Sequence, residues 1–354
     1  MLRRSCIVIF YLSLSSALGF SQDDKLDALL EAGHFKQVAR TLDPANSYDA
    51  EALYLLSNVK QGFGKTDDAV RFAEAAVKID PRKAKYHLQL AGALSDEVDK
   101  VNVFKKISLA GRIRSELETA VKLDPKNADC LFGMMMFYEA APSIAGGNKE
   151  KARQMADEIT NIDPSKGYLA QARLARGKNQ KDHIEDLYLK AVKADRTSVE
   201  ALMALANYYA SDEKKKYDLA DKYADQALKL DASRAGPYVV SAEAAAFQQS
   251  WGKLDSLLSK SEQANHDDLN PFYQASRTLL QLNQELTRAE RYMRTYLSQD
   301  PEGLTPPLSA AHWRLALILE KEGRKADAIK ELEEALRLEP DFENAKKDLK
   351  RLKG

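Results

Sequence analysis

The sequence of 354 residues has little cysteine, little glycine and no excess of either charge. Two cysteines, Cys6 and Cys130, are too few for a disulfide framework, so the fold must be stabilised by packing. Lys and Arg together number 53, and Asp and Glu also number 53, so no strong field favours nucleic acid as a partner. Only 16 glycines occur, and runs of β-branched residues are nearly absent, which favours helices throughout.

Motifs that would indicate catalysis or metal binding are also missing. No His-Glu-x-x-His occurs, and neither His183 nor His266 has a second ligand at metal spacing, so we expect no metal and no cofactor. Cys130 stands beside apolar residues and is expected to be a buried, inert thiol. Gly146-Gly147-Asn148 lacks the Lys-Ser/Thr ending of a phosphate loop, so we expect a turn followed by an Asn148 helix cap. These features predict a protein that is not an enzyme.

The first 21 residues differ from the rest of the chain. Arg3-Arg4 precedes an apolar stretch that starts at Cys6 and gives way to small residues, which is the layout of a secretory signal. We expect cleavage after Gly19 or Ser21 and no stable membrane span thereafter. The lack of an Asn-x-Ser/Thr sequon favours export to a bacterial periplasm. The alternative is a protein anchored in the membrane through an uncleaved signal.

One sequence motif recurs along the rest of the chain. In its full form, Ala69 and Ala76 are followed by Asp80-Pro81. The same offsets recur in three further places: Ile113, Ala120 and Asp124-Pro125; Ala152, Ile159 and Asp163-Pro164; Ala328, Ala335 and Glu339-Pro340. Such internal self-similarity is typical of a protein built from stacked repeats.

The stretch from residue 48 to 81 shows what one repeat contains. Leu53 and Ser57 recur at helical spacing, Gly64 interrupts the pattern, and a second apolar face follows from Ala69 to Ala76. Small side chains let the two helices approach closely, and Pro81 cannot continue the second helix. The repeat is therefore predicted to be a helix hairpin.

These residues resemble the tetratricopeptide repeat, in which a Leu and a small residue mark the first helix and two alanines mark the second. The last unit is the most similar, with Trp313, Leu315-Ala316, Gly323, Ala328 and Pro340 at the matching positions. The resemblance covers nearly all of the chain after the signal. It implies an all-α fold, a right-handed α-solenoid of about eight helix pairs.

The expected organisation runs from one end of the chain to the other. We expect a signal peptide at 1–21, a truncated helix pair at 22–46, an array at 47–340 and a polar capping helix at 341–354. The units of the array are expected at about 47–81, 82–125, 126–164, 165–196, 197–232, 233–270, 271–301 and 302–340.

The resemblance also implies a binding surface, because the first helix of each such pair lines the concave side of the solenoid. The outward positions of these helices are Tyr54, Asn58, Phe132, Met136, Met203, Asn207 and Trp313. Apolar and amide side chains suit an extended peptide, whose backbone the amides can bind. In the alternative interpretation, several of these residues, and the run Met134–Met136 in particular, pack between neighbouring repeats.

The resulting hypothesis is a non-catalytic scaffold that holds a protein or peptide segment in the concave groove and assists assembly of a bacterial envelope complex. It assumes a groove that the chain itself leaves free. Two alternatives remain open: a hydrolase or transferase subunit with a site near the 140–148 loop, and a purely structural spacer.

Overall fold

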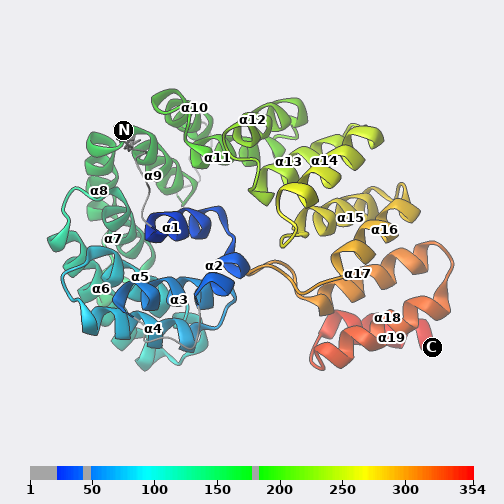
Figure 1. Cartoon of the computed structure of the whole chain (residues 1–354), viewed down its shortest axis with the longest axis horizontal. Helices are drawn as coiled ribbons and strands as arrows, with labels where there is room; N and C mark the ends of the chain where they lie inside the picture. The colour runs from blue at the N-terminus through cyan, green and yellow to red at the C-terminus, as the bar shows by residue number, and fades with distance from the viewer. Residues whose placement is uncertain (1–21, 43–48, 178–182) are drawn as a thin grey trace, which may run out of the picture.

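The computed structural model of the chain describes residues 22–42, 49–177 and 183–354 (Figure 1). The predicted signal peptide at 1–21 lies outside the described residues, as does the end of the predicted first segment at 43–46. Within the described ranges the chain forms nineteen α-helices and no strand. The predicted all-α solenoid is therefore confirmed.

Successive helices pack as antiparallel pairs. In chain order they are α1 (Gln22–Ala32) with α2 (Phe35–Thr41), α3 (Ala50–Gly62) with α4 (Thr66–Ile79), α5 (Ala84–Ser95) with α6 (Val103–Leu123), α7 (Ala128–Ala140) with α8 (Lys149–Ile162), α9 (Pro164–Gly177) with α10 (Ile184–Ala194), α11 (Val199–Ala210) with α12 (Tyr217–Leu230), α13 (Ala235–Phe247) with α14 (Trp251–Ala264), α15 (Asn270–Leu282) with α16 (Leu286–Tyr296), and α17 (Leu308–Lys321) with α18 (Lys325–Leu338), followed by α19 (Glu343–Lys353). The first helices of neighbouring pairs also contact one another, so they form the inner row of the curved array (Figure 1).

Small residues allow the two helices of a pair to pack closely, as the sequence predicts. Ala69 and Ala76 of α4 are fully buried, and the Ser57 hydroxyl of α3 donates a hydrogen bond of 2.8 Å to the Ala69 carbonyl. The same contact recurs between α15 and α16, where Ser276 donates to the Ala289 carbonyl at 2.7 Å. A larger side chain at these positions would separate the helices.

Two insertions interrupt the regular pattern. A short 3-10 helix at Val98–Lys100 precedes α6, which has 21 residues where several other second helices have 14. Between α7 and α8 a second 3-10 helix, Ser143–Ala145, leads into Gly146, whose φ of +99° favours glycine. The Asn148 side chain then accepts hydrogen bonds from two backbone N–H groups of α8 at 3.0 Å, so the predicted cap is confirmed.

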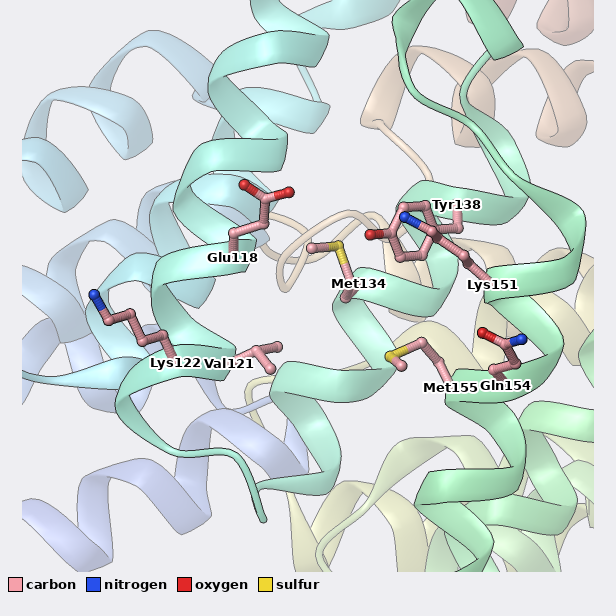
Figure 2. A pocket seen from close by; sticks show the side chains of 8 residues that line it. All are labelled: Glu118, Val121, Lys122, Met134, Tyr138, Lys151, Gln154 and Met155. Carbon is pink, nitrogen blue, oxygen red and sulfur yellow. The ribbon is translucent and has the colours of Figure 1, made fainter.

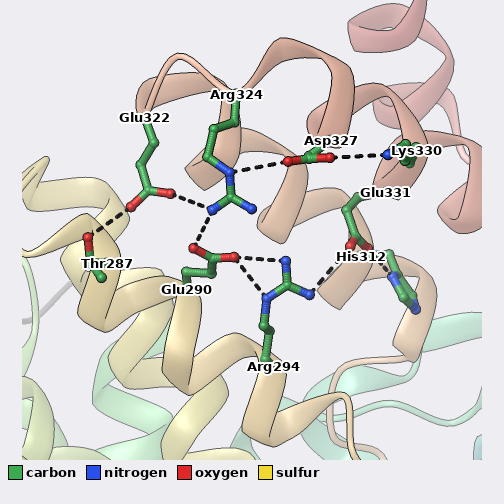
Figure 3. A network of polar contacts seen from close by, with 9 residues as sticks. All are labelled: Thr287, Glu290, Arg294, His312, Glu322, Arg324, Asp327, Lys330 and Glu331. Carbon is green, nitrogen blue, oxygen red and sulfur yellow. Dashed lines mark hydrogen bonds and ion pairs between the residues drawn. The ribbon is translucent and has the colours of Figure 1, made fainter.

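Ion pairs join the last two repeats on the surface of the second helices (Figure 3). Glu290 of α16 accepts hydrogen bonds from Arg294 at 2.8 Å and from Arg324 at 2.7 Å, and Arg324 stands at the N-terminus of α18. His312 of α17 contacts Glu331 of α18 at 2.6 Å. The network therefore links α16 of one pair to α17 and α18 of the next pair.

The first hairpin, α1–α2, lies against the inner surface of the array and contacts distant parts of the chain. Figure 1 shows α1 inside the curve formed by α3 to α9, and Asp27 of α1 pairs with Lys85 of α5 at 3.0 Å. Across the molecule, His34 contacts Ser233 at 3.0 Å and the Lys36 backbone N–H donates to Glu302 at 2.8 Å. The expectation of a groove free along the whole array is therefore wrong at its N-terminal end, where the chain covers its own inner surface.

Candidate functional site

All seven residues predicted to line the groove lie on first helices of their pairs. Six of them are half-buried, and one, Asn207, is exposed. They occupy α3, α7, α11 and α17, so the structure distributes them along the inner row and does not gather them into one pocket.

Tyr54 and Asn58 border a hollow of about 600 Å³ at the N-terminal end of the inner row. The Tyr54 ring packs on Tyr86 with 5.5 Å between centroids, and the Lys85 ammonium lies 4.6 Å from its centre. Burial, assisted by the nearby Asp27 carboxylate, raises the pKa of the Tyr54 phenol. The Asn58 amide donates to the Tyr54 carbonyl at 2.9 Å, so part of its hydrogen-bonding capacity is used within α3.

Lys85 is the charged centre of this hollow. Its ammonium contacts Glu51 of α3 at 2.6 Å and Asp27 of α1 at 3.0 Å. Burial alone would lower the pKa of Lys85, but the hydrogen bonds to Glu51 and Asp27 raise it above its usual value. A permanent cation therefore stands beside an aromatic ring, and α1 supplies one of the two carboxylates that pair with it.

Phe132 and Met136 of α7 are half-buried against the core that α4 to α9 share. Between them, a side chain at Gly133 would meet Leu88 of α5 at 2.9 Å, so α5 and α7 approach closely here. Met134 and Met135 are buried, as the alternative interpretation predicts, whereas Met136 remains partly accessible. The methionine run is thus mainly core, with one member at the surface.

Met203 and Asn207 lie one helical turn apart on α11. Met203 is half-buried, and its methyl group lies 3.8 Å from the position that a side chain at Gly236 of α13 would take. The Asn207 side chain is exposed. An apolar side chain next to an accessible amide is the combination that the peptide-binding hypothesis requires at this point of the inner row.

Trp313 is engaged by the end of the chain. Its indole N–H donates to Asp348 of α19 at 2.8 Å, and its ring meets Phe342 edge-on with 5.5 Å between centroids. The last helix therefore covers part of Trp313 and uses its polar group. This contact could not be deduced from the repeat pattern, because α19 lies outside it.

A hollow of about 400 Å³ that the sequence did not indicate lies among α6, α7 and α8. Figure 2 shows the side chains that line it. Met134, Tyr138, Val121 and Met155 form its apolar lining, with Glu118, Lys122, Lys151 and Gln154 at the edge. The Lys151 ammonium lies 5.4 Å from the centre of the Tyr138 ring. These residue types are also typical of helix packing, so no sequence signal separates this hollow from core.

Cys130 and the 140–148 loop, the candidates for catalysis, are packed against other parts of the protein. Cys130 is buried, as predicted, and burial raises the pKa of its thiol to about 11. In the 140–148 loop, a side chain at Gly147 would lie 1.7 Å from the Ala141 carbonyl oxygen, so the loop packs on its own backbone. Over the described ranges, no group of three or more His, Cys, Asp or Glu side chains could hold a metal ion.

Among the residues that the structure describes, no helix combines the length and the apolar character needed to cross a bilayer.

Two segments match sequence profiles described as tetratricopeptide repeat, residues 50–83 and residues 309–342. No curated protein sequence matches the chain. Similar solved structures include yeast Tom70, with 15% identity and a TM-score of 0.48 over 94% of this chain and 87% of that chain. A thermophilic repeat protein of Thermus thermophilus has 18% identity and a TM-score of 0.41, covering 53% and 92%. PilW, a type IV pilus biogenesis factor, has 18% identity and a TM-score of 0.46, covering 63% and 98%. All three TM-scores lie below 0.5, so no conclusion on function follows from these similarities.

The two matched segments coincide with the pairs α3–α4 and α17–α18, near opposite ends of the array. The pairs between them have the same helix–turn–helix form. Buried alanines such as Ala120, Ala191 and Ala227 recur on their second helices, except on α14, where Leu254, Leu258 and Ser261 are buried instead. The chain thus contains two segments that match the tetratricopeptide repeat, within an array of helix pairs of the same form.

Proposed function

We propose that the protein is a non-catalytic scaffold whose inner row of helices holds a segment of another protein. Two segments of the chain match the tetratricopeptide repeat, a motif that in general mediates protein–protein interaction, and this match supports the proposal. The proposal adds a location: the inner surface of α7 and α11, which carries Phe132, Met136, Met203 and Asn207. It also adds a role in assembling a complex of the bacterial envelope, which follows from the export signal predicted at residues 1–21.

The observation that supports this location best is the pairing of Met203 with Asn207 on α11. Met203 offers a flexible apolar contact, and the accessible Asn207 amide can both donate to and accept from a peptide backbone. The helix that carries both residues, α11, is fixed in place by its own fully buried residues Leu205 and Ala206. A preformed surface of this kind binds a segment without a large cost of ordering itself.

The proposal is tested by affinity capture from an envelope fraction with two matched variants of the full chain. Met203→Ala with Asn207→Ala removes both contacts, whereas Lys229→Ala removes only an exposed ion pair with Asp225 on α12. We expect the double variant to lose a partner that the wild type and Lys229→Ala both retain, with unchanged far-ultraviolet circular dichroism. Equal capture by all three proteins would contradict the proposed location.

A further inference from the structure

The hairpin α1–α2 contacts three successive connections of the C-terminal half of the array. At the connection before α13, His34 contacts Ser233, and Arg234 donates to the Glu31 carbonyl at 2.9 Å. At the connection before α15, Arg40 forms a two-pronged ion pair with Asp267. The third connection, before α17, supplies Glu302. The hairpin is therefore held by the same edge of three neighbouring repeats.

Lys36 forms the densest of these contacts. Its ammonium donates to the Asp300 carbonyl at 2.6 Å and to the Asp267 carbonyl at 3.2 Å, and its backbone N–H donates to Glu302 Oε1 at 2.8 Å. The Glu302 residue is only 3% exposed, and the ammonium lies 3.8 Å from its second oxygen. These contacts are polar and directional. They join α2 to connections more than 200 residues later in the sequence.

The apolar attachment of the same hairpin is small. Its core consists of four buried residues, Leu26, Val38, Leu55 and Val59, whereas α4 to α9 share a much larger cluster. Beside it remains the hollow of about 600 Å³ bordered by Asp27, Tyr54 and Lys85, with Leu304 of the distant connection at its edge. A unit with few buried apolar contacts opens at a lower free-energy cost than the rest of the fold.

We propose that α1–α2 is a clasp: an internal occupant of the N-terminal inner surface that opens to let a partner segment of the same chemistry bind there. This inference rests on the proposed function and names the class of partner at one end of the surface. The partner is an amphipathic helix with an acidic residue opposite Lys85.

The contacts of α1 define this partner. Leu26 supplies the buried apolar side chain, and Asp27 supplies the carboxylate that pairs with Lys85. Arg234 binds the carbonyl of Glu31 near the C-terminal end of α1, where a helix carries partial negative charge. A competing helix therefore needs a leucine followed by an acid, with a free C-terminal turn that reaches Arg234.

Opening of the clasp is tested first, without any partner, by hydrogen exchange and mass spectrometry on the full chain. Arg40→Glu places two acids face to face, and Arg40→Glu with Asp267→Arg restores an ion pair in reverse. Arg71→Glu, which breaks the exposed pair with Asp68 on α4, is the matched control. We expect exchange in α1–α2 to rise about fivefold or more in Arg40→Glu alone, while α3–α4 is unchanged. Exchange that rises equally in α1–α2 and α3–α4 would show that the hairpin is an integral repeat and would overturn the proposal.

Binding at the vacated surface is tested with a fluorescent synthetic peptide of residues 22–42 added to the full chain. Its own Arg40 can pair with Asp267 only where the internal hairpin is displaced. We expect this peptide to bind Arg40→Glu about tenfold more tightly than the wild type, and Arg40→Glu with Lys85→Ala much more weakly. Equal affinity for the wild type and Arg40→Glu would overturn the clasp. Because no envelope partner is involved, this result is independent of the capture experiment on α11.

Discussion

Arg40 of α2 donates to both oxygens of the Asp267 carboxylate, although 227 residues separate the two in the sequence. The contact joins the first hairpin of the array to a connection six helix pairs later. Two-pronged pairs of this kind fix the orientation of both partners, which an ordinary exposed ion pair does not. It makes the protein a solenoid whose first hairpin is held against its C-terminal half, with part of its inner surface covered.

The small-residue contact between paired helices predicts the effect of one substitution. Ala328 of α18 is fully buried, so Ala328→Leu should lower the free energy of unfolding by about 1–3 kcal/mol through overpacking. Ala326 on the same helix is exposed, and Ala326→Leu should leave stability nearly unchanged. Chemical denaturation of both variants measures the difference. Equal midpoints would place these residues on the wrong faces of α18.

The Arg–Glu network of Figure 3 predicts a loss of stability in acid. Burial would raise the pKa of Glu290, but hydrogen bonds from Arg294 and Arg324 hold it below its usual value. A carboxyl with a lowered pKa contributes stability above its unfolded value of about 4.5, and loses it as the pH falls through the native pKa. Glu290→Gln should therefore melt at a lower temperature at pH 7 and show a smaller decrease on acidification. A variant whose melting curve follows the wild type at every pH would exclude this role.

Glu302 predicts the opposite dependence for the clasp. Burial raises its pKa to about 7, with Asp268 and Asp267 contributing in the same direction and Lys36 opposing them. The contribution of Glu302 to docking should therefore be fully present below about pH 4.5 and be lost as the pH rises through 7.

Neighbouring groups limit the pH range in which this effect can be read. Burial also lowers the pKa of His34, which favours its neutral form in the docked state and works against docking below about 6.5. The test is hydrogen exchange in α2 between pH 6.5 and 8, corrected for the intrinsic chemical rate. Protection should fall with pH in the wild type and stay level in Glu302→Gln, and parallel profiles would refute this assignment.

Cys130 predicts a slow chemical reaction. Its thiol is buried and has a pKa of about 11, so little reactive thiolate forms at pH 8. A thiol reagent should label Cys130 only after denaturant is added. Rapid labelling of the native protein, located at Cys130 by mass spectrometry, would show that α7 is more accessible than the structure indicates.

The local features of this chain could be predicted because short-range patterns determine them. The spacing of Ala69 and Ala76 predicts a buried helix face, and Asn148 after two glycines predicts a helix cap. The clasp could not be predicted, since Lys36, Arg40 and Asp267 are ordinary surface residue types whose meeting depends on the curvature of the whole array. The contact of Trp313 with Asp348 was missed for a similar reason, because the repeat pattern stops before α19.

Site-specific photo-crosslinking can detect a protein segment bound at the inner surface of the array. A photoreactive amino acid is placed at Asn207 on the inner row, or at Lys229 on α12 as a matched exposed position. We expect a discrete crosslinked partner from Asn207 and none from Lys229. A partner crosslinked from Lys229 but not from Asn207 would contradict that expectation.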